Sequence, residues 1–214
     1  MSHYFEDDQT LKNQDYIVTF SIFDREISVF TNNGMFSKNK LDRGSYFFIK
    51  EVLKMKPTGE ILDYGCGNGV IGLTLNLFFQ ELGVTYCDIN PRCLQATKKN
   101  LDKYKLNGKI VHSLDLHTLN PASFDMILLN PPISCGKEQI YKMYELAKFL
   151  LKDDGRFLIV IRKDKGMLSH KAYLESIFKT VTILSKEKGY YILEMKKSLK
   201  EPTNEILQRL PKIK

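Results

Sequence analysis

The N-terminal part of the chain alternates apolar and polar residues. This alternation runs over residues 16–23 and again over residues 26–30, with Asp24 and Arg25 between the two runs. A period of two residues is typical of a strand with one buried face. The pattern therefore predicts a β-hairpin that turns at Asp24 and Arg25.

Beyond this hairpin, segments with helical spacing of apolar residues alternate with short apolar runs. The spacing predicts helices over residues 45–56, 70–79, 91–104, 137–151 and 169–178. The apolar runs predict strands that include residues 61–62, 84–87, 109–112, 124–129, 157–161, 180–184 and 190–195. Strands that alternate with helices are typical of a sheet covered on both faces. We therefore predict an α/β fold with a doubly wound, mostly parallel sheet, whose last two strands form an antiparallel hairpin.

Turn-forming residues separate these segments and suggest domain boundaries. Asn90 and Pro91 suit the start of a helix, and the sequence Asp-Asp-Gly at residues 153–155 predicts a turn. We predict three regions from the element pattern and the composition. They are a small N-terminal β-hairpin extension over residues 1–40, an α/β domain over residues 41–197 and a basic tail over residues 198–214.

The length and composition are typical of a globular protein. The chain has 214 residues, of which 43% are hydrophobic, and this is enough for a full core. No apolar run reaches the ~18 residues that cross a bilayer, and the acidic N-terminus is unlike a signal peptide, so we expect a cytoplasmic protein without a membrane partner. The four cysteines lack C-x-x-C spacing and the four histidines are scattered. We therefore expect reduced thiols and no metal site.

Charge is distributed unevenly along the chain, whose formal net charge is +7. Residues 1–136 carry 14 Lys and Arg against 15 Asp and Glu, whereas residues 137–214 carry 18 against 10. A basic region suits a polyanion such as nucleic acid. Lysine-rich, solvated helix faces would give the same counts, so charge alone leaves both interpretations open.

A glycine-rich motif joins the strand at residues 61–62 to the helix at residues 70–79. Its sequence is Asp63-Tyr64-Gly65-Cys66-Gly67-Asn68-Gly69, with glycine at alternate positions. Glycines at such a turn let the backbone approach a nucleotide closely. Two kinds of site share this arrangement. Residues 67–72 match the dinucleotide fingerprint G-x-G-x-x-G, whereas Asp63 completes D-x-G-x-G-x-G, a pattern typical of S-adenosylmethionine sites.

Acidic residues after three successive strands favour S-adenosylmethionine as the cofactor. A carboxylate at Asp63 would attract the cationic sulfonium and ammonium groups and would be unfavourable beside a pyrophosphate. Asp88 can accept the ribose hydroxyls, and Asp115 can accept the adenine amino group, although each aspartate alone could be a helix cap or a turn residue. The predicted cofactor contacts are Asp63, Gly65, Cys66, Gly67, Asn68, Gly69, Asp88, Ile89, Asp115 and Leu116.

The sequence Asn130-Pro131-Pro132 follows the apolar run at residues 124–129. The Asn130 carboxamide oxygen and the Pro131 carbonyl are acceptors that can hold both hydrogens of a planar amino group. This would direct the nitrogen lone pair toward a donor methyl. We therefore predict these three residues as catalytic, with Asn130 also contacting the cofactor. The alternatives are a structural turn and, because Cys135 lies nearby, methylation of a pyrimidine carbon through a cysteine nucleophile.

Six segments of the chain match one family of enzymes. They are residues 34–37, 41–45, 61–69, 88–90, 130–133 and 189–192. Together they resemble the ribosomal RNA guanine-N2 methyltransferases of the small-subunit, RsmC-like group. The resemblance implies a seven-stranded class I methyltransferase sheet and methyl transfer from S-adenosylmethionine to the exocyclic amine of a guanine in ribosomal RNA. It also implies that Asp42, Gly44 and Ser45 lie near the cofactor. The chain departs from the pattern at Ile133, where many members have an aromatic residue.

The resemblance and the charge distribution predict ribosomal RNA or a ribosomal subunit as the partner. The predicted substrate-binding residues are Ile133, Lys38, Arg162, Lys163 and Lys165. The basic side chains would contact phosphates, and a flipped base would enter beside Asn130. Two alternatives stay open. One is a glutamine-N5 protein methyltransferase, since the glutamine amide is also planar. The other is a non-catalytic ribosome-assembly factor that binds the donor or RNA.

Overall fold

The structure is a computed structural model that describes residues 15–32 and 40–197. Lys38, residues 34–37 of the family resemblance and the predicted tail at residues 198–214 lie outside the described residues. Contacts between residues divide the chain into two compact units, residues 1–116 and 117–214. The boundaries predicted at residues 40 and 197 stay predictions, because each borders a segment that is not described.

The first unit begins with an antiparallel hairpin, as predicted. Its strands are β1 (Asp15–Ile22) and β2 (Arg25–Asn32). Ile22 pairs with Arg25, so the two-residue turn lies at Phe23-Asp24, one residue before the predicted position. The apolar residues of the alternating pattern are buried on one face. These residues are Val18, Ile22, Ile27 and Val29.

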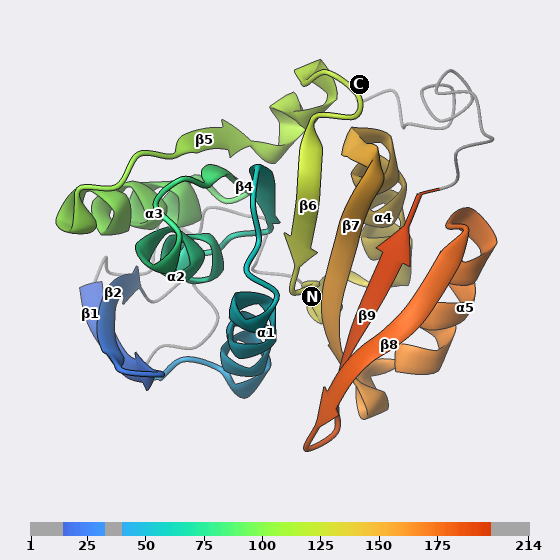
Figure 1. Cartoon of the computed structure of the whole chain (residues 1–214), viewed down its shortest axis with the longest axis horizontal. Helices are drawn as coiled ribbons and strands as arrows, with labels where there is room; N and C mark the ends of the chain where they lie inside the picture. The colour runs from blue at the N-terminus through green and yellow to red at the C-terminus, as the bar shows by residue number, and fades with distance from the viewer. Residues whose placement is uncertain (1–14, 33–39, 198–214) are drawn as a thin grey trace. The chain divides into compact units, whose positions relative to one another are not determined.

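Strands and helices alternate through the rest of the first unit. They are α1 (Arg43–Lys54), β3 (Glu60–Tyr64), α2 (Val70–Phe78), β4 (Gly83–Asp88), α3 (Pro91–Tyr104), β5 (Lys109–His112) and the 3-10 helix η1 (Ser113–Thr118). The Asn90 side chain caps α3 by accepting a hydrogen bond from Arg92 N at 3.0 Å. Figure 1 shows the β1–β2 hairpin next to α2 and α3. The predicted strand–helix order is thus confirmed in this unit.

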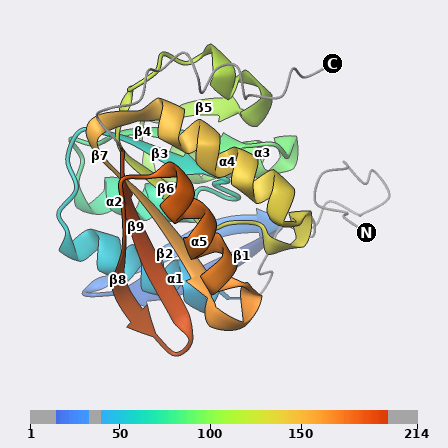
Figure 2. The same ribbon diagram turned by 90° about the vertical axis from the view of Figure 1, so that its right-hand side faces the viewer.

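The second unit continues the alternation and ends in an antiparallel hairpin. Its elements are β6 (Phe124–Leu129), η2 (Ile133–Cys135), α4 (Lys137–Leu150), β7 (Leu151–Arg162), η3 (Lys163–Lys165), α5 (Met167–Ile177), β8 (Thr180–Glu187) and β9 (Tyr190–Lys196). In Figure 2, α4 and α5 run along one side of the strands β7, β8 and β9. The residues at the end of β6, which the sequence predicts as a buried strand, are fully buried. These residues are Ile127, Leu128 and Leu129.

The seven strands that follow the hairpin form one sheet in the order β5-β4-β3-β6-β7-β9-β8. The pairs β3–β4, β4–β5 and β6–β7 are parallel, whereas β9 is antiparallel to both β7 and β8. This confirms the predicted seven-stranded, mostly parallel α/β fold. It also confirms the antiparallel pairing of the last two strands.

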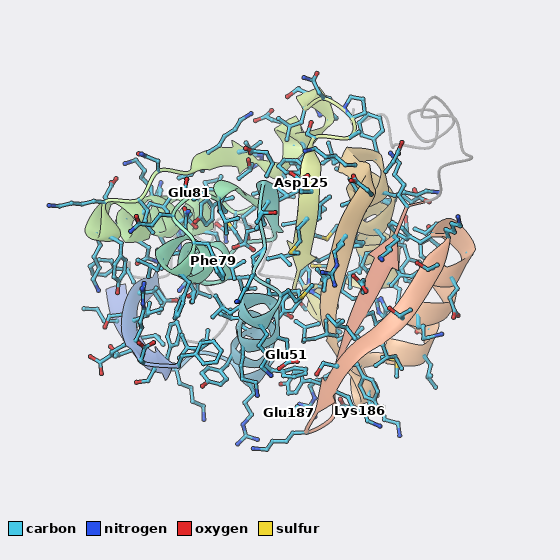
Figure 3. The ribbon with its side chains drawn as sticks, viewed as in Figure 1. Glu51, Phe79, Glu81, Asp125, Lys186 and Glu187 are labelled. Atoms are coloured by element: carbon cyan, nitrogen blue, oxygen red, sulfur yellow. The ribbon has the colours of Figure 1, made fainter. Side chains whose placement is uncertain are left out.

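The turn predicted at residues 153–155 is wrong. These residues lie within β7, where Phe124 pairs with Leu151 but Met126 pairs with Arg156. The extra residues of β7 form an irregularity in the pairing rather than a loop. Lys152 donates hydrogen bonds to both carboxylate oxygens of Asp125 at 2.9 Å, and Figure 3 labels Asp125 at the start of β6. Pairing with β6 at Leu151 and at Arg156, on either side of residues 153–155, together with this ion pair, favours an extended form in a segment whose composition favours a turn.

Candidate active site

The glycine-rich motif forms a tight connection between β3 and α2. Gly65, Gly67 and Gly69 have φ values of 70°, 58° and 76°, a backbone region that residues with a Cβ adopt at a cost. The backbone amides of Gly65 and Cys66 both donate to Cys87 O, at 2.7 and 2.9 Å. The loop therefore turns away from the end of β3 while it stays bonded to β4.

Asp63, the acidic residue of the motif, is buried beneath this loop. It is 1% exposed, and its Oδ2 accepts a hydrogen bond from Gly72 N at 2.8 Å. Loss of water raises the pKa of the Asp63 carboxyl to about 7; the Gly72 hydrogen bond opposes this shift, and the nearby Asp88 charge adds to it. The carboxyl thus changes its charge near neutral pH, which makes it a candidate functional group.

Asp88 lies on the other side of the loop, at the end of β4. Its Oδ2 accepts from Gly67 N and its Oδ1 accepts from Asn90 N, both at 2.9 Å. Burial raises its pKa, and the backbone hydrogen bonds and the charge of His112 oppose that rise. His112 Nε2 also lies 2.8 Å from Ile89 O. The structure therefore brings Asp63, Asp88 and the glycine loop together, as the sequence predicts.

The other predicted cofactor residues of the first unit differ in exposure. Asp115 lies on η1 and is exposed, whereas the adjacent Leu116 is fully buried. Ser45 is 5% exposed in the first turn of α1, where its backbone amide donates to Asp42 Oδ1 at 3.0 Å. Asp42 therefore has a clear structural role as the N-cap of α1. Cofactor contacts from these residues stay predictions.

Sequence reasoning missed two residues of α3 that contact the loop. Thr97 Oγ1 donates to Gly67 O at 3.0 Å, and Asn100 Nδ2 donates to Asn68 O at 2.9 Å. Both residues have no exposed surface. A signal exists in the sequence, because both polar residues lie on the stripe of α3 that also carries the buried Cys93, Ala96 and Leu101. Polar residues within such a stripe need buried partners.

In the second unit, Asn130-Pro131-Pro132 leads directly from β6 into η2. Asn130 and Pro132 are partly exposed, and Pro131 is buried. Cys135 N donates to Pro132 O at 3.0 Å and Gly136 N to Ile133 O at 3.3 Å, which closes the short turn. Ile133 is partly exposed at the start of this turn. The predicted catalytic residues and the predicted base contact are therefore adjacent in the chain, and all of them except Pro131 are partly exposed.

The predicted phosphate contacts Arg162, Lys163 and Lys165 are exposed at the end of β7 and on η3. Arg162 pairs with Asp164 at 2.9 Å, and its guanidinium lies 5.6 Å from the Tyr190 ring centroid. Lys163 N donates to Gly189 O at 2.9 Å, which connects η3 to the turn of the β8–β9 hairpin. Figure 3 labels Lys186 and Glu187 near the tip of that hairpin. We call residues 162–165 the basic loop.

No disulfide forms among the residues that the structure describes. Cys66, Cys87 and Cys93 are buried, and burial raises the pKa of each thiol, so these groups remain protonated. Cys135 is partly exposed in η2. Within residues 15–32 and 40–197, no three or more His, Cys, Asp or Glu residues are grouped as metal ligands would be. The helices in these ranges are too short or too polar to span a membrane.

Residues 26–194 match the protein family described as methyltransferase small domain. The chain belongs to this family. The Bacillus subtilis protein YbxB, which is described as uncharacterized, is 32% identical over 197 residues, covering 91% of this chain and 98% of that protein. Ribosomal RNA small subunit methyltransferase C of Pseudomonas putida is 33% identical over 135 residues, covering 63% of this chain and 39% of that protein. These matches confirm the resemblance to the RsmC-like group.

A solved structure supports the same fold. The T. thermophilus 16S rRNA N2 G1207 methyltransferase (RsmC), solved in complex with AdoMet and guanosine, has a TM-score of 0.76 and 23% identity. The similarity covers 86% of this chain and 51% of that chain. The chain thus spans about half or less of the ribosomal RNA methyltransferases named here, and nearly the full length of YbxB.

Proposed function

We propose that this chain is a methyltransferase that transfers the methyl group of S-adenosylmethionine to an exocyclic amine of ribosomal RNA, and that the amine is guanine N2 of the small-subunit RNA. The observation that carries this proposal is the sequence Asn130-Pro131-Pro132 at the end of a buried strand, with Asn130 and Pro132 partly exposed, in a chain that matches the methyltransferase small domain over residues 26–194. The names of the ribosomal RNA methyltransferases it matches support the substrate class.

S-adenosylmethionine is the cofactor, and the glycine loop of the first unit (residues 65–69) is its proposed binding site. Three glycines with left-handed backbone conformations occupy alternate positions of the loop, and without a Cβ at these positions a ligand can approach the backbone closely. Asp63 offers a carboxylate to a cationic ligand, Asp88 offers acceptors for ribose hydroxyls, and Asp115 offers one for the adenine amine. Ser45, Ile89 and Leu116 complete the proposed contacts. The T. thermophilus enzyme solved with AdoMet, which has the same fold, supports this choice.

Positioning and electrostatics account for the proposed reaction. The Asn130 carboxamide oxygen and the Pro131 carbonyl accept the two hydrogens of the amine, and Pro131 and Pro132 have no N–H that would compete. This arrangement would free the lone pair of the nitrogen for reaction. Bound S-adenosylmethionine would supply the methyl group: a new N–C bond would form and the C–S bond would break to leave S-adenosylhomocysteine. The nitrogen loses its proton to water after the bond has formed, so no strong base is required.

The second unit supplies the proposed RNA contacts. Arg162, Lys163 and Lys165 are exposed on the basic loop and can neutralise phosphates. Ile133 follows N-P-P and can pack against a base that has left its stack. Lys38, which lies outside the described residues, is a further proposed contact. A protein that modifies ribosomes would act in the cytoplasm.

The proposal is tested by incubating the purified chain with S-adenosylmethionine labelled in its methyl group. Separately purified, unmodified 30S subunits, 50S subunits, naked 16S RNA and a release factor are the acceptors. Label at guanine N2 in the 16S RNA or the 30S subunit supports the proposal. Label on a release-factor glutamine supports the protein methyltransferase instead, and label on no acceptor overturns the proposed activity.

The matched variant is Asn130→Ala. We expect methyl transfer to fall by roughly a thousandfold, because the variant loses the carboxamide acceptor that orients the amine. Binding of S-adenosylhomocysteine, measured by calorimetry, should change by less than about threefold, because most donor contacts come from the first unit. Wild-type methyl transfer in this variant would show that Asn130 has no catalytic role.

A further inference from the structure

Helix α3 contacts the glycine loop through two side chains outside the motif. Thr97 donates to Gly67 O at 3.0 Å and Asn100 donates to Asn68 O at 2.9 Å. Both residues have no exposed surface. Because they lie three residues apart on one face of α3, they hold two successive carbonyls of the loop. The loop is thus supported by a helix as well as by the strands that flank it.

The Asn100 side chain also binds the N-terminal hairpin. Its Oδ1 accepts from Phe30 N at 2.7 Å, and its Nδ2 donates to Phe30 O at 3.0 Å as well as to Asn68 O. Asn68 Nδ2 donates to the same Phe30 O at 3.2 Å. Asn100 therefore uses its carbonyl and its amino group at one point, where strand β2, the glycine loop and α3 meet.

The hairpin has other attachments that do not reach the loop. Ser28 N donates to the Tyr104 hydroxyl at 2.8 Å, and that hydroxyl donates to Ser28 O at 3.0 Å. Near the hairpin turn, the Arg25 guanidinium lies 4.6 Å from the Phe78 ring centroid. Tyr104 shows that the backbone N–H and C=O groups at the edge of β2 can be hydrogen-bonded without any bond to the glycine loop. The additional bond from Asn100 to Asn68 therefore needs a different explanation.

The explanation lies in the conformation of the loop. Asn68 is between Gly67 and Gly69, which both have positive φ values, and glycine samples many other conformations at little cost. A loop that must be ordered when its ligand binds loses affinity by the free energy of ordering. Fixed carbonyls at Gly67 and Asn68 remove this cost before the ligand arrives.

We propose that Asn100 is a positioning residue of the donor site. It fixes the carbonyl of Asn68 and couples the glycine loop to Phe30, so the β1–β2 hairpin is a structural part of the donor site. This inference rests on the proposed function, in which the glycine loop binds S-adenosylmethionine. Coupling between two sites is reciprocal, so donor binding must in turn stabilise the pairing of Phe30 with Asn100.

The first test compares Asn100→Ala with Tyr104→Phe in the full-length chain. Calorimetry with S-adenosylhomocysteine should show a dissociation constant about tenfold higher for Asn100→Ala and less than about threefold higher for Tyr104→Phe. Both variants weaken the attachment of the hairpin, but only the first changes the support of the loop. In methyl-transfer assays, the donor KM of Asn100→Ala should rise while kcat at saturating donor is largely retained. Equal dissociation constants for wild type and Asn100→Ala would overturn the inference.

The second test uses the wild-type chain and therefore does not depend on the folding of a variant. Hydrogen exchange of the Phe30 amide, which donates to Asn100, should slow when S-adenosylhomocysteine is added. Binding without any change at Phe30 would overturn the positioning role and leave the proposed function intact. A wild-type chain that does not bind S-adenosylhomocysteine would overturn the donor site itself, and with it this inference.

Discussion

The two units hold their functional candidates in different ways. In the first unit, Asp63 and Asp88 are buried, and both accept hydrogen bonds from backbone amides around the glycine loop. In the second unit, Asn130 is partly exposed and the basic loop is exposed. A buried, bonded arrangement suits a small ligand of constant shape. An exposed arrangement suits a large substrate that approaches from solvent, and this difference agrees with the proposal of a donor site in the first unit and RNA contacts in the second.

The largest expected effect separates two glycines with the same backbone conformation. Gly69 and Gly189 have φ values of 76° and 83°, but a Cβ on Gly69 would lie 2.9 Å from Thr97 Cγ2, whereas a Cβ on Gly189 meets no atom within 4 Å. We expect Gly69→Ala to lower the free energy of unfolding by about 3 kcal/mol, from backbone strain and overpacking together. For Gly189→Ala, strain alone should cost about 1 kcal/mol.

Urea denaturation followed by circular dichroism measures both losses, and calorimetry measures donor affinity. Gly69→Ala should also weaken donor binding, because Thr97 must move and would release the Gly67 carbonyl. The Gly189→Ala variant should bind the donor like the wild type. Equal losses of stability in the two variants would mean that the space beside Gly69 is not filled as the structure shows.

A smaller effect concerns the charge of Asp63, whose pKa burial raises to about 7. In the unfolded chain this carboxyl has an ordinary, lower pKa, so the native state holds a proton that the unfolded state has lost. The stability of the donor-free protein should therefore fall as the pH rises from about 4 to about 7 and level off above that. In the proposed donor site the ionised carboxylate attracts the cationic donor, so we expect donor affinity to rise by up to about tenfold per pH unit below pH 7.

Asp63→Asn is the variant that checks this linkage. Its carboxamide oxygen can still accept the hydrogen bond from Gly72 N, but it carries no charge. At pH 8 we expect the variant to have a higher melting temperature without donor than the wild type. Its affinity for S-adenosylmethionine should nevertheless be weaker, so the substitution stabilises the fold and impairs donor binding. Calorimetry from pH 6 to pH 8 should find a donor affinity that no longer varies with pH. An unchanged pH dependence in the variant would assign the titration to another group.

The smallest effect is expected in the second unit, from Lys163→Gln combined with Lys165→Gln. The slope of log affinity against log salt is negative, and each lost phosphate contact reduces its magnitude by roughly 0.7 to 0.9. The double variant should therefore bind ribosomal RNA several-fold more weakly, with a slope whose magnitude is smaller by about 1.5. Filter binding at several salt concentrations measures this slope. The control is Lys54→Gln with Lys98→Gln, an equal charge change at exposed lysines of the first unit. Equal slopes for the two double variants would exclude the basic loop as an RNA contact.

The sequence predicts that Asp63, Asp88 and the glycine loop lie together, because these residues are close in the sequence or follow neighbouring strands. Alternate glycines and the Asp63 carboxylate occupy one short segment, and Asp88 follows the next strand, so strand order alone brings them together. The contacts of Asn100 could not be predicted in the same way. They join residues that are 32 and 70 positions apart, and their partners are backbone groups that leave no signature in the sequence.

The same reasoning explains the wrong turn at residues 153–155. Aspartate and glycine favour turns in isolation, but β7 begins at Leu151 because Leu151 pairs with Phe124 on β6. Lys197, which follows Leu151 by 46 positions, also stabilises the start of β7. Its side chain donates to Leu151 O at 3.1 Å and forms an ion pair with Asp153. Tertiary pairing thus overrides local preference in this segment.

The position of β9 has a consequence for synthesis of the chain on the ribosome. This strand follows every other described strand in the sequence, yet it lies between β7 and β8 in the sheet. While the chain emerges from its N-terminus, β8 is complete before any partner for it exists, and β7 has one open edge. Residues 190–196 supply the partner of both strands, since they pair antiparallel with β7 on one edge and with β8 on the other. The sheet of the second unit therefore stays incomplete until residues 190–196 are available, and a chain that stops before residue 190 would leave β8 unpaired.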